Sequence, residues 1–135
     1  MQKIIYSIDK GRKFGLWKDS VSKLMYFDCM EEFLTGIDTS GNIADYGGAN
    51  GNLKHFIPNS ISIDIDSSKN PDILDNILTH TGNYDLIVIR YVLHYLTEEQ
   101  RKELFEHLRT FHSGKPVLII QFVNNGKDFE IKKKN

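Results

Sequence analysis

Ile43-Ala-Asp-Tyr-Gly-Gly-Ala-Asn-Gly-Asn-Leu53 is the stretch that decides how the rest of this chain folds. It enters as a short apolar strand over residues 42–44, reaches an acid at Asp45, and breaks into a Gly-Gly-Ala-Asn-Gly turn. It leaves as the start of a short helix over residues 50–56. Glycines at such a crossing allow positive φ angles and a close approach of the backbone to a ligand. The amides that follow favour a carboxylate or a phosphate above the helix end.

The spacing of the glycines separates two classes of ligand. Nicotinamide and flavin enzymes use the pattern G-x-G-x-x-G at this turn. Counted from Gly47, the pattern requires glycine where the chain has Ala49 and Asn52, and counted from Gly48 it fails twice as well. The spacing therefore disfavours a nicotinamide oxidoreductase. The alternative interpretation, a glycine-rich turn that binds no ligand, remains open at this point.

The composition is that of one globular domain over residues 1–135. Hydrophobic residues make up 40% of the chain and charged residues 26%, which are ordinary values for a soluble protein. The formal net charge of −1 gives no field that would attract a nucleic acid or a membrane surface.

The chain also lacks the residues that build disulfides and metal centres. Its single cysteine, Cys29, excludes an internal disulfide and any cysteine-rich metal site. The five histidines show no metal-ligand spacing, so we expect no metal. No signal peptide and no apolar run of about 18 residues is evident, and we therefore expect a cytoplasmic protein.

Short apolar stretches alternate with polar connections after the glycine turn. Residues 61–65 alternate between isoleucine and polar residues, and a brief strand over 72–74 follows a loop. Residues 85–90 and 117–122 are continuous apolar runs, which are typical of parallel strands covered on both faces.

Two helices are expected to cover this sheet. The sequence Thr97-Glu-Glu-Gln100 is a capping box and predicts a helix over about 98–112. An apolar stripe predicts a second helix over about 20–35. We therefore expect a helical N-terminal segment over 1–40 and a Rossmann-like core over 41–123. The fold class is a three-layer α/β/α sandwich with a mostly parallel sheet, in strand order 3-2-1-4-5 within the core.

Candidate binding residues all lie where a predicted strand ends. They are Asp45 with the glycine turn, Asp64, Asp75 and Arg90. Ligands of open α/β sheets bind beyond the carboxyl ends of the strands, so these residues should share one site. Asp64 ends the second core strand and can accept the hydroxyls of a ribose, and Asp66 is the neighbouring alternative on the same face.

In order and spacing, these pieces resemble the class I S-adenosylmethionine-dependent methyltransferases. Asp45-x-Gly47-x-Ala49-x-Gly51 is similar to their acid-x-G-x-G-x-G motif, with alanine for the middle glycine. Three later segments resemble the second, third and fourth motifs of the methyltransferase type 11 group. They are Ser62-Ile-Asp-Ile-Asp66, Pro71-Asp-Ile-Leu-Asp-Asn-Ile77 and Tyr84-Asp-Leu-Ile-Val-Ile-Arg-Tyr-Val-Leu-His-Tyr-Leu96. The resemblance covers residues 40–123 and implies S-adenosylmethionine as the cofactor.

By that resemblance, Asp45 and the backbone of the turn after it would hold the methionyl part of the cofactor. The turn residues are Tyr46, Gly47, Gly48, Ala49, Asn50 and Gly51. The main chain of Arg90 would lie near the methionyl ammonium.

The resemblance also assigns the nucleoside part. Asp64 would bind the ribose, and Ile65 would pack on the adenine. Asp75 would accept a hydrogen bond from the adenine amino group, and the Asn76 amide would meet a ring nitrogen. Leu74 stands where the family has glycine before the acid, which is a departure in the adenine pocket.

Methyl transfer from a sulfonium asks for positioning more than for reactive side chains. His94 is a weak candidate for a general base, and covering the edge of the pocket is its plainer interpretation. Phe14 and Trp17 are candidates to close the site, although aromatic residues are more often part of a core.

Two absences disfavour DNA as the acceptor. No Asn/Asp-Pro-Pro-Tyr/Phe follows the fourth strand, and Cys29 does not follow a proline as a cytosine-methylating nucleophile would. We therefore expect a methyltransferase acting on an unidentified acceptor, a small molecule rather than DNA. The alternative is a non-catalytic sensor or activating subunit that binds S-adenosylmethionine or S-adenosylhomocysteine.

The family continues after its fifth strand with a helix and two further strands, whereas about a dozen residues remain here. The outer edge of residues 117–123 would then present unpaired N–H and C=O groups. We expect this edge to be covered by the chain's own tail, by a second copy in a homodimer or by a partner subunit.

Overall fold

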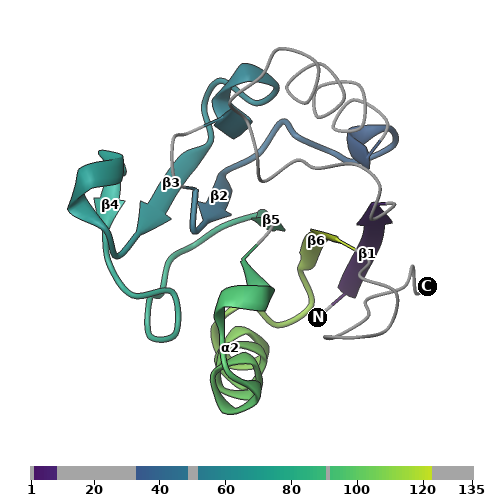
Figure 1. Ribbon diagram of the computed structural model, residues 1–135. Helices are drawn as coiled ribbons and strands as arrows, with labels where there is room; N and C mark the ends of the chain where they lie inside the picture. The colour runs from purple at the N-terminus through teal and green to yellow at the C-terminus, as the bar shows by residue number, and fades with distance from the viewer. Residues whose placement is uncertain (1, 9–32, 49–51, 91, 123–135) are drawn as a thin grey trace.

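Six parallel strands form one sheet in the computed structural model, which describes residues 2–8, 33–48, 52–90 and 92–122. Neighbouring strands follow the order β1-β6-β5-β2-β3-β4 (Figure 1). The strands are β1 (Gln2–Ile8), β2 (Ile43–Tyr46), β3 (Ile61–Asp64), β4 (Ile73–Leu74), β5 (Leu86–Arg90) and β6 (Pro116–Phe122). The helical elements are the 3-10 turns η1 (Asn52–His55), η2 (Ser67–Lys69) and η3 (Leu93–Tyr95), and the α-helix α2 (Glu98–Phe111).

The five strands from β2 to β6 have the order that the sequence predicts. The chain runs outward from β2 to β3 and β4, then crosses back so that β5 lies on the other side of β2. Asp45 therefore pairs with Ser62 of β3 on one side and with Val88 of β5 on the other. The point where the strand order reverses lies between β2 and β5, and ligands of such sheets bind there.

The first strand is a departure from the prediction. Residues 2–8 were expected within a helical segment over 1–40, but they form β1, which pairs with β6 from Gln2 opposite Pro116 to Ile8 opposite Phe122. The apolar start of the chain is too short to show a period, and its partner β6 is the last strand in the described part of the chain. β6 thus has a neighbour on both sides. The edge at which we expected the tail, a second copy or a partner subunit is covered by the chain's own first strand.

Helix α2 covers one face of the sheet (Figure 1). It begins at the predicted capping box: the Gln100 N–H donates to Thr97 Oγ1 at 3.1 Å, and the Thr97 N–H donates to Gln100 Oε1 at 2.9 Å. Leu104 and Leu108 are fully buried against this face. Burying one leucine contributes about 1.5–3 kcal/mol, so these two side chains hold the helix on the sheet. The sheet residues of the same core are Ala44, Tyr46, Ile63, Ile87, Ile89, Val117 and Ile119.

The opposite face is covered in part by η1, which lies on the other side of the sheet in Figure 1. Its Leu53 is fully buried, and Phe33, which is helical together with Leu34, is buried as well. The rest of the helix predicted over 20–35 lies outside the described residues. The helix expected over 50–56 is only the short turn η1 in its described part. No helix in the described part of the chain is long and apolar enough to cross a membrane.

Candidate functional site

A tight turn follows β2 at the carboxyl edge of the sheet. Gly47 adopts a φ of 67°, and its N–H donates to the Ile63 carbonyl of β3 at 2.7 Å. A Cβ on Gly47 would lie 2.6 Å from Val92 Cγ2, and one on Gly48 would lie 2.8 Å from Asp45 Oδ2. Both glycines are therefore needed for space, and Gly47 for its backbone angle as well. The next three residues of the predicted cradle, 49–51, lie outside the described residues.

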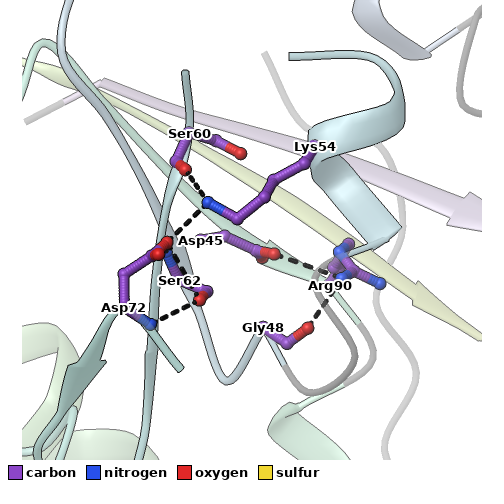
Figure 2. A network of polar contacts seen from close by, with 7 residues as sticks. All are labelled: Asp45, Gly48, Lys54, Ser60, Ser62, Asp72 and Arg90. Atoms are coloured by element: carbon purple, nitrogen blue, oxygen red, sulfur yellow. Dashed lines mark hydrogen bonds and ion pairs between the residues drawn. The ribbon is translucent and has the colours of Figure 1, made fainter. Parts of the chain in front are cut away.

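Asp45 lies inside β2, which extends two residues beyond the predicted end at residue 44. Only 1% of its surface is exposed, and its partner is Arg90 at the end of β5, which is also buried. Arg90 Nη2 donates to Asp45 Oδ2 and to the Gly48 carbonyl, each at 3.1 Å (Figure 2). The sequence assigned a role only to the main chain of Arg90, but its side chain joins the acid to the glycine turn.

Two opposing effects act on the Asp45 carboxyl. Burial raises its pKa, and the neighbouring Arg90 guanidinium lowers it by less, so the pKa is raised overall. Its second oxygen, Oδ1, is buried and accepts no hydrogen bond in the described part of the chain. The base of the turn therefore holds a buried ion pair with one unused acceptor, which is an arrangement that calls for an explanation in a folded protein.

Two acids follow β3, and the structure gives them different roles. Asp66 caps η2, because its Oδ1 accepts from the Ser68 N–H at 3.0 Å and from the Ser68 hydroxyl at 2.7 Å. These bonds, the one from the hydroxyl first, lower the pKa of Asp66. Asp64 ends the strand half-buried, with its Oδ1 accepting from the Asp66 N–H at 2.9 Å. Ile65 beside it is 70% exposed.

Asp75 lies next to Asp64, because its N–H donates to the Asp64 carbonyl at 3.0 Å. Its Oδ1 accepts at 2.8 Å from the N–H of Asn76, the amide that the sequence predicts to meet an adenine nitrogen. Its Oδ2 lies 2.8 Å from His80 Nδ1, and His80 Nε2 lies 2.8 Å from the Tyr84 hydroxyl. The hydrogen bond with His80, followed by that from Asn76, lowers the pKa of Asp75. Neither His80 nor Tyr84 was a predicted site residue.

A second polar cluster fastens the short strand β4 to its neighbours (Figure 2). Lys54 Nζ donates to Asp72 Oδ2 and to the Ser60 carbonyl, each at 2.5 Å. The Ser62 N–H also donates to Asp72 Oδ2 at 2.8 Å, and the Asp72 N–H donates to Ser62 Oγ at 3.0 Å. Because the Lys54 and Asp72 side chains are partly exposed, the ion pair itself contributes little. The backbone bonds place the chain just before Asp75.

The turn η3 places two exposed aromatic side chains directly after β5. The rings of His94 and Tyr95 lie with their centroids 4.1 Å apart, and Tyr95 is 80% exposed. His94, the candidate base, thus lies at the edge where the binding residues gather. Phe14 and Trp17, the candidates to close the site, lie outside the described residues. Within the described ranges, no group of three or more His, Cys, Asp or Glu side chains is placed to hold a metal ion.

Solved structures that superpose on this chain include two that are described as methyltransferases, and all of those named below are complexes with SAM or SAH. A complex of DhpI with SAM and HEP superposes with a TM-score of 0.62 and 9% identity, covering 86% of this chain and 64% of that one. Magnesium protoporphyrin IX methyltransferase from Synechocystis PCC 6803 with bound SAM gives 0.60 and 15%, covering 90% and 73%. CalO1, a methyltransferase in calicheamicin biosynthesis in its SAH-bound form, gives 0.50 and 18%, covering 86% and 44%. No family model and no curated protein matches the sequence.

The chain has the class I methyltransferase fold. It spans about two thirds of the length of the DhpI structure, and less of CalO1. Within the class I methyltransferase fold, the strand order 3-2-1-4-5 that the sequence predicts is confirmed. The parallel strand β1 beside β6 is a feature that the resemblance did not predict.

The turn geometry predicts how Gly47→Ala should behave. Gly114 provides a matched control, since it has a φ of 77° but open space around it. Gly114→Ala should lose about 1–2 kcal/mol through the backbone angle alone. Gly47→Ala should lose about 1–3 kcal/mol more, because its methyl group meets Val92. Urea unfolding measures both, and adding Val92→Ala should restore the excess. Equal losses in the free energy of unfolding for the two substitutions would show that Val92 leaves room for a methyl group at position 47.

The buried pair predicts a pH-dependent loss of stability. Arg90→Met leaves Asp45 buried without its partner and should cost roughly 3–5 kcal/mol at neutral pH. Without the guanidinium, the pKa of Asp45 in the folded protein rises further above that of the unfolded chain. The folded variant then binds a proton at Asp45 more tightly than the unfolded variant does, so lowering the pH favours the folded form. The loss in free energy of unfolding relative to the unmutated chain should therefore be smaller at about pH 5 than at about pH 7.

Guanidinium unfolding at both pH values tests this expectation. The double variant Asp45→Asn/Arg90→Met is the control, because it removes both charges and should lose the pH dependence of the penalty. If Arg90→Met lowers the free energy of unfolding by the same amount at both pH values, Asp45 is not an ionised carboxylate that needs the Arg90 charge.

Proposed function

We propose that this chain binds S-adenosylmethionine at the carboxyl edge of the sheet and transfers its methyl group to a small-molecule acceptor. The observation that carries the proposal is the meeting of three features at the ends of β2, β3 and β4. They are the glycine turn, the strand-end acid Asp64 beside the exposed Ile65, and the acid Asp75. The SAM- and SAH-bound structures that share the fold support the choice of cofactor.

The residues present fit this cofactor. A carboxylate at the end of β3 suits the two hydroxyls of a ribose, and Ile65 offers an apolar surface for adenine beside it. Asp75 follows β4, the strand next to β3, so its carboxylate lies about one strand spacing from Asp64. There it offers acceptor oxygens to the adenine amino group. Asp45 Oδ1, buried without a donor, lies under the turn assigned to the cationic methionyl group.

When bound, S-adenosylmethionine supplies an activated methyl group on a positively charged sulfur. The chain's task is then to hold the methyl carbon in line with the acceptor and to exclude water. His94 and Tyr95, exposed on η3 beside the site, are the candidates for the acceptor side. If the acceptor atom carries a proton, His94 is the base that would take it.

Methyl transfer is tested with S-adenosylmethionine labelled on its methyl group. Incubation with panels of small-molecule acceptors should release S-adenosylhomocysteine and label one acceptor class. Calorimetric binding of the cofactor without turnover on any panel would instead favour the non-catalytic sensor or activating subunit.

The assignment of the ribose predicts different outcomes at two neighbouring acids. Asp64→Ala should weaken S-adenosylmethionine binding by about 1.5–3 kcal/mol, which is roughly ten- to a hundredfold or somewhat more, because two charge-assisted bonds are lost. Asp66→Ala is the matched control. It removes the cap of η2 and should weaken binding much less. Titration calorimetry on the three proteins decides between them, and equal losses at both acids would overturn the assignment.

A further inference from the structure

Asp75 is hydrogen-bonded to the buried side chain of His80, which in turn is hydrogen-bonded to the buried Tyr84. The sequence did not predict either as a site residue. His80 lies 2.8 Å from Asp75 Oδ2 through Nδ1 and 2.8 Å from the Tyr84 hydroxyl through Nε2. His80 is 6% exposed and Tyr84 4%, whereas 43% of the Asp75 side chain is exposed. The three residues therefore form a line from the core to the rim of the site.

The backbone around His80 is also fixed. The His80 N–H donates to the Asn76 carbonyl at 2.8 Å, and the His80 carbonyl is 2.8 Å from His107 Nε2 on helix α2. Gly82 leaves room for the Tyr84 ring, since a Cβ there would lie 2.5 Å from the ring. The backbone of His80 is thus held by the loop and by α2, and the imidazole cannot turn without breaking its own bonds to Asp75 and Tyr84.

The direction of the first hydrogen bond follows from Asp75, because its ionised carboxylate can only accept and His80 Nδ1 must therefore donate to Oδ2. Burial, and then the charge of Asp75, raise the pKa of Tyr84, so its hydroxyl keeps its proton and can donate to His80 Nε2. An imidazole that accepts at Nε2 carries its proton on Nδ1 and donates it to Asp75 Oδ2. A doubly protonated imidazole would donate there as well. With the Asn76 N–H on Oδ1, each oxygen of Asp75 receives one donor from the chain.

An ionised carboxylate accepts hydrogen bonds whatever its neighbours are, and what the two donors add is a fixed orientation of its remaining lone pairs. Its outward lone pairs suit a ligand group that carries N–H, such as an exocyclic amine on a purine. They repel the oxygen of a 6-oxo purine, because two acceptors would then face each other.

We propose that His80 and Tyr84 are positioning residues, which fix the orientation of the Asp75 carboxylate and so make the site select a 6-amino over a 6-oxo purine nucleoside. The inference rests on the proposed function, since it assigns Asp75 to the base of S-adenosylmethionine. It adds that the selectivity resides in a buried pair that does not touch the ligand.

Calorimetry with S-adenosylhomocysteine and its deaminated 6-oxo analogue, S-inosylhomocysteine, tests the proposal. The unmutated chain should bind the amino form at least about tenfold more tightly. His80→Gln places an amide near Nε2 and leaves Asp75 Oδ2 without its donor, so this ratio should fall towards one. His80→Asn is the matched rescue, because its amide lies near Nδ1, and it should keep most of the ratio.

Tyr84→Phe gives a second measurement that preserves the packing of the ring. Without the hydroxyl, the imidazole is oriented less firmly, and the ratio should fall partway. Thermal melts of each variant show whether it is folded. A merely structural role of His80 or Tyr84 would weaken the binding of both ligands equally and leave the ratio unchanged.

The outcomes distinguish this inference from the function on which it rests. If the unmutated chain binds both nucleosides equally, or His80→Gln keeps the full ratio, the inference is overturned while cofactor binding stands. If the unmutated chain binds neither nucleoside at concentrations near a millimolar, the proposed function fails and the inference fails with it.

Discussion

A buried ion pair between Asp45 and Arg90 joins the two strands on either side of the switch point. The same guanidinium donates to the Gly48 carbonyl, so one cation ties the end of β5, the acid of β2 and the glycine turn together. Removing either charge would leave the other buried and unpaired, which is more costly than the net gain of the pair itself. The shape of the turn, and the position of everything it is proposed to bind, depend on this contact.

Around that contact the acids are arranged strand by strand. Asp64 and Asp75 lie at the ends of β3 and β4, joined by the backbone bond from the Asp75 N–H to the Asp64 carbonyl. Asp66, only two residues from Asp64, is committed to capping η2. Position relative to the strand end, rather than residue type, therefore separates the two acids proposed to meet the cofactor from the acid that caps η2.

Local patterns predicted most of the core from the sequence. The capping box of α2, the apolar run of β5 and the order of β2 to β6 follow from periodicity and from right-handed crossovers. The sequence missed contacts between distant residues. β1 has no period of its own, and its partner β6 closes the described part of the chain. Arg90 is 45 residues from Asp45, and a histidine in a loop gives no sign that it will lie beneath Asp75.

The most direct test is a crystal structure of the chain grown with S-adenosylhomocysteine. The ribose hydroxyls should lie on the Asp64 carboxylate, with the adenine between Ile65 and Asp75 and the methionyl group over the turn at Gly47. A nucleoside bound away from the ends of β2, β3 and β4, or no bound nucleoside at concentrations near a millimolar, would contradict a cofactor site at this edge of the sheet.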